Sequence, residues 1–119
     1  MRVRMIVALL GLVALSSGEG RAYEDHHGAI AAARDGSYGY SYDHPTRRNA
    51  ERAALRECGS LGCVVKLWFK NNCAAYARGR GGEGWAYNDS LEDAKQRAID
   101  ECEARGSGCE VVCWACNTR

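Results

Sequence analysis

Cysteine is the residue type in this chain whose number and spacing could do chemistry. The sequence has seven cysteines in 119 residues, all of them in its second half or just before it. Thiolates can bind zinc, exchange electrons as a Cys-x-x-Cys pair, or join as disulfides. The compartment decides among these, because disulfides persist only in oxidising surroundings. The cysteines are Cys58, Cys63, Cys73, Cys102, Cys109, Cys113 and Cys116.

Residues 1–22 have the pattern of a signal peptide. Two arginines precede an apolar run at residues 5–15, and Gly20-Arg21-Ala22 fits a cleavage site with small residues. The apolar run is too short to span a bilayer comfortably. We therefore expect cleavage after Ala22 and export to a periplasm or the extracellular space, with no membrane insertion of the mature chain. An uncleaved membrane anchor is the alternative.

Export predicts three disulfides. Two pairs each join the end of an expected helix to the start of the next expected strand. A third pair follows the last strand of each half, so we expect it to join the two halves. This assignment leaves Cys113 as a buried free thiol, although six cysteines permit other connectivities. The predicted pairs are Cys58–Cys63, Cys102–Cys109 and Cys73–Cys116.

Zinc binding is the alternative for the last four cysteines. Cys113-x-x-Cys116 with Cys102 and Cys109 would supply four thiolates, as in structural zinc sites. The same Cys-x-x-Cys spacing occurs in redox pairs, but here it lies within an expected strand rather than at a helix start, where a thiolate is stabilised. Export favours disulfides over both, so we expect no metal and no cofactor.

No set of side chains in the sequence is typical of catalysis. The serines of the mature chain lie in expected turns, helix caps or a strand of small residues, without the context of an activated nucleophile. The acidic pairs Glu92-Asp93 and Asp100-Glu101 belong to the surface of an expected helix. The three histidines lie in expected loops and lack the spacing of metal ligands. We therefore expect that the protein is not an enzyme.

The elements that must position the cysteines are present twice. Residues 29–69 and 74–115 can be aligned with small gaps, and the stretch from Thr46 to Cys58 matches Ser90 to Cys102 without a gap. A period of about 45 residues is typical of a duplicated supersecondary unit. Each copy has the pattern strand, strand, helix, strand, with Thr46 and Ser90 as the expected helix N-caps.

We therefore predict an α+β fold made of two tandem β-β-α-β repeats, residues 28–72 and 73–119, packed as one small disulfide-stapled domain. The last strand of each copy should bury alternate residues, and residues 79–84 should form a hairpin turn between the copies. The expected buried faces are Cys63, Val65, Leu67 and Phe69 in the first copy and Cys109, Val111, Cys113 and Ala115 in the second.

The two expected helices differ in charge. Arg48, Arg52 and Arg56 are spaced by four and so lie on one face, while the second helix has Glu92 and Asp100 at matching places. Like charges at this spacing repel mildly, so the arginine row costs some stability. A basic and an acidic helix could orient a partner. The alternatives are two solvated faces, or two helices that face each other within the fold.

Aromatic side chains alternate along two expected strands. Exposed tyrosine and tryptophan side chains dominate binding hot spots, so these rows are candidate anchors for a protein or glycan partner. The alternative is that they pack under the helices, with the small residues between them on the outer face. The aromatic residues are Tyr38, Tyr40, Tyr42, Trp85 and Tyr87.

The predicted mature chain has 13 basic and 14 acidic residues, and this near-balance argues against nucleic-acid binding. We expect a monomeric, non-catalytic, exported protein-binding module, such as a periplasmic inhibitor or an immunity-type protein. The alternatives are a secreted effector acting on a host or neighbouring cell, and a small metal-binding or hydrolytic envelope protein. The candidate binding residues are Arg48, Arg52, Arg56, Glu92, Asp100, Tyr40, Tyr42, Trp85 and Tyr87.

Four segments together resemble one family. They are Gly28-Ala29-Ile30-Ala31, Tyr38-Gly39-Tyr40-Ser41-Tyr42, Ala50 to Leu55 followed by Cys58, and Cys63-Val64-Val65 through Cys73-Ala74-Ala75. The combination resembles the exported bacterial family catalogued as domain of unknown function 4189, over essentially the whole mature chain. The resemblance implies a small secreted α+β domain with a disulfide framework. It implies no catalytic residues, and Cys113 is extra to its pattern.

Overall fold

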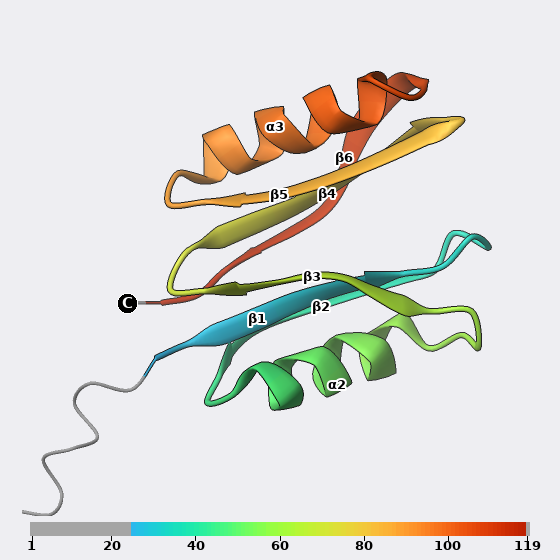
Figure 1. Cartoon of the computed structure of the whole chain (residues 1–119). Coiled ribbons are helices and arrows are strands. Elements are labelled where there is room, and N and C mark those ends of the chain that lie inside the picture. Colours follow the sequence, from blue (N-terminus) through green and yellow to red (C-terminus); the bar gives the residue numbers. More distant parts are fainter. Residues whose placement is uncertain (1–24, 119) are drawn as a thin grey trace, which may run out of the picture.

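The computed structural model describes residues 25–118, so the predicted signal peptide and its cleavage site lie outside the described residues. The described chain has an α+β fold with two three-stranded sheets and two helices (Figure 1). The elements are β1 (His27–Ala32), β2 (Tyr38–His44), α2 (Arg47–Cys58), β3 (Val64–Lys70), β4 (Cys73–Arg80), β5 (Gly82–Asn88), α3 (Leu91–Glu103) and β6 (Ser107–Cys116).

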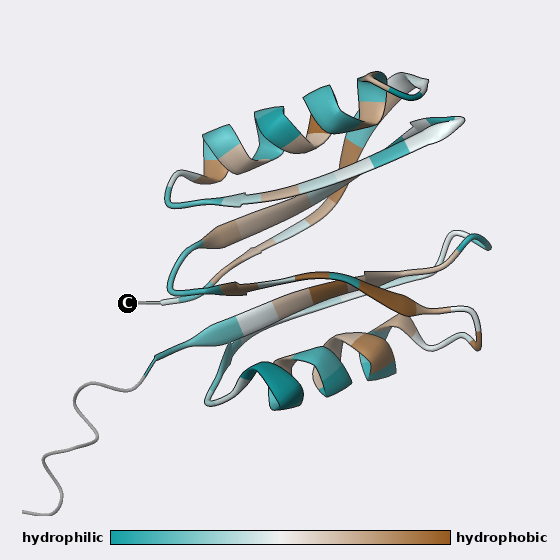
Figure 2. Ribbon diagram, viewed as in Figure 1, coloured by the Kyte–Doolittle hydropathy of each residue, from teal (hydrophilic) through white to brown (hydrophobic). Residues whose placement is uncertain are grey.

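The first half of the chain, residues 27–70, forms one sheet and the second half, residues 73–116, forms the other. The strand orders are β2-β1-β3 and β5-β4-β6, and all pairs are antiparallel. The sheets lie face to face, with α2 and α3 on the two outer sides, which gives four layers (Figure 1). Both helices contain many hydrophilic residues, while β1 and β3 contain strongly hydrophobic ones (Figure 2).

Both helices begin at the expected caps and pack closely on their sheets. Thr46 accepts a hydrogen bond from the backbone of Asn49, and Ser90 accepts one from the backbone of Asp93. Alanines form the buried contact rows of the helices, against alanines of β1 and β4. Short side chains on both surfaces let helix and sheet approach closely. These alanine rows are Ala50 and Ala54 in α2 and Ala94 and Ala98 in α3.

The space between the two sheets holds the larger side chains. Ile30, Phe69 and Tyr76 are among the largest fully buried side chains of the described chain, and all three belong to this layer. Alternate residues of the central strands therefore face different layers. In each strand one set of alanines faces the helix, and the alternate set, which includes Ile30 in β1 and Tyr76 in β4, faces the opposite sheet.

The expected buried faces of β3 and β6 are only partly right, because each strand contains a β-bulge. In β3, Leu67 pairs with Ile30 but Val65 pairs with Ala31, so that Lys66 is an extra residue. The bulge reverses the alternation. Cys63 therefore packs on the helix side, and Leu67 and Phe69 pack between the sheets.

The last strand, β6, has the same irregularity. Its register shifts between the residues that pair with Tyr76 and Ala77, which makes Val112 the extra residue. Cys109 and Val111 then pack against α3, while Cys113 and Ala115 pack between the sheets. The four side chains do not share one face, contrary to the prediction.

The hairpin predicted at residues 79–84 lies within the second half rather than between the halves. Gly81 connects β4 to β5, and its φ of 78° is a conformation that favours glycine. Asn71 and Asn72 make the connection between the halves. Within the described part of the chain, neither helix has the length and apolar composition needed to cross a membrane.

Candidate functional site

The cysteines form three disulfides, and Cys113 is free and buried. The third disulfide has a different place from the one expected. Cys73 and Cys116 are cross-strand partners in β4 and β6, so their disulfide lies within one sheet. None of the three disulfides joins the two halves. The pairs are Cys58–Cys63, Cys102–Cys109 and Cys73–Cys116, the same as those predicted from the sequence.

The arginine row predicted on the first helix is exposed. Arg48, Arg52 and Arg56 lie on the outer side of α2, and none of them forms an ion pair with another described residue. Glu92 and Asp100 are exposed on α3, on the opposite outer side of the molecule (Figure 1). The basic and acidic helices therefore do not face each other within the fold.

The tyrosines of β2 do not pack under a helix. Tyr40 and Tyr42 are 41% and 51% exposed, whereas Gly39 and Ser41, which alternate with them along the strand, are buried beneath α2. The Ser41 hydroxyl donates a hydrogen bond of 2.7 Å to the carbonyl oxygen of Ala50. The small residues thus occupy the helix side, and the aromatic row remains at the molecular surface.

The second aromatic row lies apart from the first one, because β2 and β5 are edge strands of different sheets. Trp85 is half-buried and stacks on Tyr76 with ring centroids 6.4 Å apart, while Tyr87 is exposed. With Asp100, they line a hollow of about 510 Å³ between β5 and α3. The structure therefore brings together Trp85, Tyr87 and Asp100, but separates them from the arginine row.

A larger cleft, of about 970 Å³, opens between the two sheets at the end where the β1–β2 and β4–β5 hairpins lie. Val64 contributes exposed apolar surface from the first half, with the buried Ala32 behind it in the wall. Lys66, Arg78 and Glu83 contribute charge to the same cleft from β3, β4 and β5. The bulge in β3 places Lys66 here, because the extra residue turns toward the second sheet.

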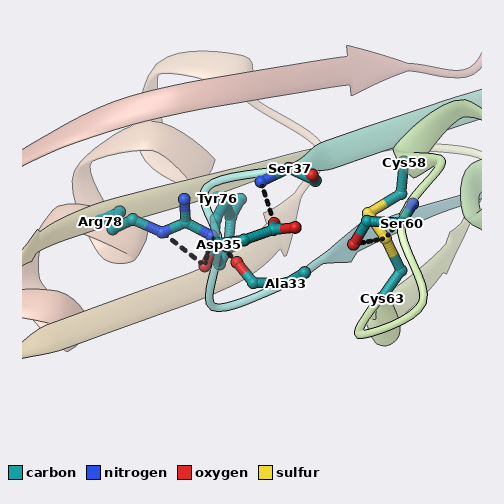
Figure 3. The surroundings of a disulfide bond; sticks show 8 residues. All are labelled: Ala33, Asp35, Ser37, Cys58, Ser60, Cys63, Tyr76 and Arg78. Atoms are coloured by element: carbon teal, nitrogen blue, oxygen red, sulfur yellow. Dashed lines mark hydrogen bonds between the residues drawn. A yellow bond between two sulfur atoms is a disulfide. The ribbon is translucent and has the colours of Figure 1, made fainter.

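A hydrogen-bonded cluster links the sheets at the base of this cleft. The Tyr76 hydroxyl donates to a carboxylate oxygen of Glu83, and the Nζ of Lys66 lies 3.0 Å from the other one. Arg78 donates to the Tyr76 hydroxyl from Nε and Nη2, and from Nη2 to the carbonyl oxygen of Ala33 at 2.9 Å. Figure 3 shows Arg78 reaching from β4 to this carbonyl, near the Cys58–Cys63 disulfide.

Burial and hydrogen bonding shift the pKa values of this cluster. Burial and the hydrogen bond to Glu83 raise the pKa of Tyr76 to about 12. Burial acts to raise the pKa of Glu83, but the hydrogen bonds from Tyr76 and Lys66 outweigh it, and the pKa is lowered. Tyr76 is therefore a neutral donor and Glu83 a charged acceptor at neutral pH. The cluster holds an ionised carboxylate between the sheets.

Cys113 lies beside this cluster. It pairs across the strands with Tyr76 and is 5% exposed. Burial raises the pKa of its thiol to about 12, so the thiolate that reacts with electrophiles and metals is scarce at neutral pH. The free cysteine behaves as a small apolar side chain of the core.

The histidines belong to the end of the sandwich opposite the cleft. The Nδ1 of His26 lies 3.2 Å from a carboxylate oxygen of Asp43, and His27 stacks on Trp68. Thr118, after β6, donates to Asp43 from its backbone and hydroxyl. Among residues 25–118, no three side chains of His, Cys, Asp or Glu are grouped as metal ligands.

The sequence did not indicate the cleft, because its charged residues come from different strands and show no common motif. Lys66 and Glu83 are 17 residues apart. One signal was available. Tyr76 and Arg78 interrupt the small, apolar residues of a strand that otherwise resembles β1, and buried polar interruptions of this kind mark a network or a site.

Comparisons with known proteins agree with the fold. The NMR structure of Rv1813c from Mycobacterium tuberculosis is similar to this chain, with a TM-score of 0.59 and 32% identity over 77% of this chain and 75% of that one. Protein Rv1269c from the same organism is 34% identical, over 78% of this chain and 71% of its own length. Uncharacterized protein Rv1813c is 35% identical, over 77% of this chain and 61% of its own length.

The family model described as domain of unknown function (DUF4189) matches residues 27–116, which include every helix and strand of the described chain. The match covers both halves and all seven cysteines. This chain therefore belongs to the DUF4189 family.

Proposed function

We propose that the protein is an exported protein-binding module that uses the outer face of α2 to bind an acidic surface of its partner. The observation that supports this most directly is the row of Arg48, Arg52 and Arg56, exposed and without ion pairs among the described residues. By contrast, Arg47 on the same helix pairs with Glu51 at 2.9 Å. An unpaired basic row is available to a partner.

The arrangement of the row suits recognition of a folded partner. A helix packed on a sheet through alanines and closed by a disulfide at its end is rigid, so little conformational entropy is lost on binding. Charges at the rim of an interface raise the association rate and select partners of opposite sign. A periplasmic inhibitor or an immunity-type protein would use the arginine row in this way, to select and bind its target protein.

The test is capture of partners on the immobilised oxidised chain, from the envelope and the medium of the native organism. A variant with Arg48→Glu, Arg52→Glu and Arg56→Glu is run beside it. We expect a partner to be retained by the wild-type protein and lost by the variant. Three charge reversals at an exposed interface should weaken binding by at least about tenfold.

The control reverses or adds charge on the other helix, through Asp93→Arg, Gln96→Arg and Glu103→Arg, which are exposed positions outside the two hollows. This variant should keep the partner. Equal affinity of the wild type and the arginine variant for a verified partner would remove the α2 face from the proposal.

We also infer that residues 28–72 and 73–119 are tandem copies of one β-β-α-β unit. The element order, the central position of β1 and β4, and the bulges at Lys66 and Val112 support this inference. The copies would then have diverged in charge, which is how one copy could acquire a binding face.

Export to a periplasm or the extracellular space is likewise part of the proposal. Three disulfides in a chain of this size suit an oxidising compartment. Detection of the protein in the periplasmic fraction would favour an inhibitor of an envelope protein. Detection in the medium would favour an effector that acts on another cell.

A further inference from the structure

The cleft between the hairpins has cationic groups without a carboxylate partner. Arg34, after β1, and Arg105, before β6, are exposed and line the cleft. Within residues 25–118, neither arginine has a carboxylate in ion-pair distance. Arg105 donates one long, exposed hydrogen bond, of 3.4 Å, from Nη1 to the backbone oxygen of Glu83. Both guanidinium groups can therefore turn toward a ligand.

The carboxylates of the same cleft are already engaged. Both oxygens of Glu83 are bonded, one to the Tyr76 hydroxyl and one to Lys66. Asp35 accepts a hydrogen bond of 2.8 Å from the backbone of Ser37, and this bond with others lowers its pKa. Glu83 is thus bonded by its own neighbours. Asp35 interacts electrostatically with Arg78 at the base, but it forms no ion pair with Arg34 or Arg105 at the mouth.

Arg78 provides a fixed donor at the base of the cleft. Its Nε and Nη2 are held by Tyr76 and by the carbonyl oxygen of Ala33, whereas Nη1 makes no hydrogen bond to any residue of the described chain. An arginine held on one side loses little entropy when the other side binds a ligand. Guanidinium groups match the geometry of carboxylate and phosphate oxygens.

We propose that this cleft binds the oxyanion group of a small molecule, a phosphate or a carboxylate, between Arg78 at its base and Arg34 and Arg105 at its mouth. The volume of about 970 Å³ lies within the range of small-molecule sites. Val64, which is exposed, offers apolar contact to the rest of the ligand. The site lies between the sheets, away from the outer face of α2. A small molecule could therefore occupy it whether or not a protein partner is bound to α2.

The test is a titration of the full chain with inorganic phosphate and, separately, with acetate, followed by NMR at constant ionic strength against chloride. We expect saturable shifts at the backbone amides of Gly62, Gly81 and Gly82, which line the cleft. Phosphate alone would identify a doubly charged group, and both anions a general oxyanion site. No saturable shift with either anion would overturn the proposal.

The variant R34Q/R105Q tests the assignment without disturbing the core, because both side chains are exposed. Removal of two charge-assisted contacts should weaken binding by about tenfold. The control K70Q/R97Q removes the same charge from exposed positions outside the cleft and should titrate as the wild type does. Equal weakening in both variants would show non-specific attraction to positive charge, and weakening in neither would show that Arg34 and Arg105 do not bind the anion. Either result would overturn the proposal.

Discussion

Tyr76 is the residue that joins the polar cluster to the core. Its ring is fully buried between the sheets, and its hydroxyl donates to Glu83 and accepts two bonds from Arg78. A buried polar network of this kind stabilises only while every member has a partner. Loss of the hydroxyl would leave Glu83 and Arg78 with unmade bonds inside the molecule.

The substitution Tyr76→Phe should lower the free energy of unfolding by about 1–3 kcal/mol near neutral pH. Because the pKa of Tyr76 rises from 10.0 to about 12 on folding, its protonated form is favoured in the folded state. The resulting contribution of Tyr76 to the free energy of unfolding is complete below pH 10 and is lost as the pH approaches 12. Denaturant unfolding between pH 10 and pH 12 should show that the free energy of unfolding falls less in the variant than in the wild type. Parallel plots of this free energy against pH for the two proteins would contradict the prediction.

The thiol of Cys113 should be unreactive in the folded protein. It is buried, and its pKa of about 12 leaves little thiolate at mildly alkaline pH. A colorimetric thiol reagent should modify no cysteine of the native oxidised protein, and one per chain in denaturant. Rapid modification under native conditions would mean that the strand opens or that a disulfide is exchanged.

At the scale of elements, the distance between each helix and its sheet depends on small residues in the strands. Gly39 faces the backbone of Ala54 and Cys58 in α2, and Gly84 faces that of Ala98 and Cys102 in α3. A Cβ at Gly84 would lie 2.5 Å from the Cys102 nitrogen, closer than real side chains approach. The alanine rows and these glycines thus determine the same spacing.

The substitution Gly84→Ala should therefore destabilise the protein by about 1–3 kcal/mol, since α3 must move away from β5. The control is Gly62→Ala, where the new Cβ would make an ordinary contact of 3.7 Å with Ala33. Thermal unfolding of both variants measures the difference. An unfolding temperature for G84A as high as that of G62A would show that the helix moves without cost.

The elements themselves could be predicted from the sequence, because caps, strand alternation and helix spacing are local patterns. Thr46 and Ser90 mark the helix starts in sequence and structure alike. The bulges could not be predicted from the sequence, because Lys66 and Val112 are ordinary strand residues. Only the pairing with the neighbouring strand shows that each is an extra residue. The cleft could not either, because it depends on how the two sheets face each other.

At the scale of the whole molecule, the two halves are held by non-covalent contacts and one short connection. The apolar layer between the sheets, the Lys66–Glu83 pair and the bond from Arg78 to Ala33 join them near the cleft. At the other end, Asp43 of the first half is bonded to Asn117 and Thr118 of the C-terminus. The disulfides stabilise each half separately.

Removal of the disulfides should have unequal effects. The Cys73–Cys116 disulfide spans 43 positions and the Cys58–Cys63 disulfide spans five. In the chain-entropy model these loops correspond to about 4 and about 2 kcal/mol, respectively. Unfolding of the two double variants, with both cysteines of a pair changed to serine, measures the difference. Equal losses would show that loop entropy does not decide the contribution.

The connection between the halves has one more consequence. Only Asn71 and Asn72 lie between β3 and β4, and Asn71 holds a φ of 58°, a conformation that an extended chain would not need. If Asn71 and Asn72 adopted an extended conformation, two molecules could exchange their second halves and form a domain-swapped dimer. All three disulfides could form in the swapped dimer, because each one joins two cysteines of the same half. Refolding at high concentration should then give an intertwined dimer beside the monomer, separable by gel filtration.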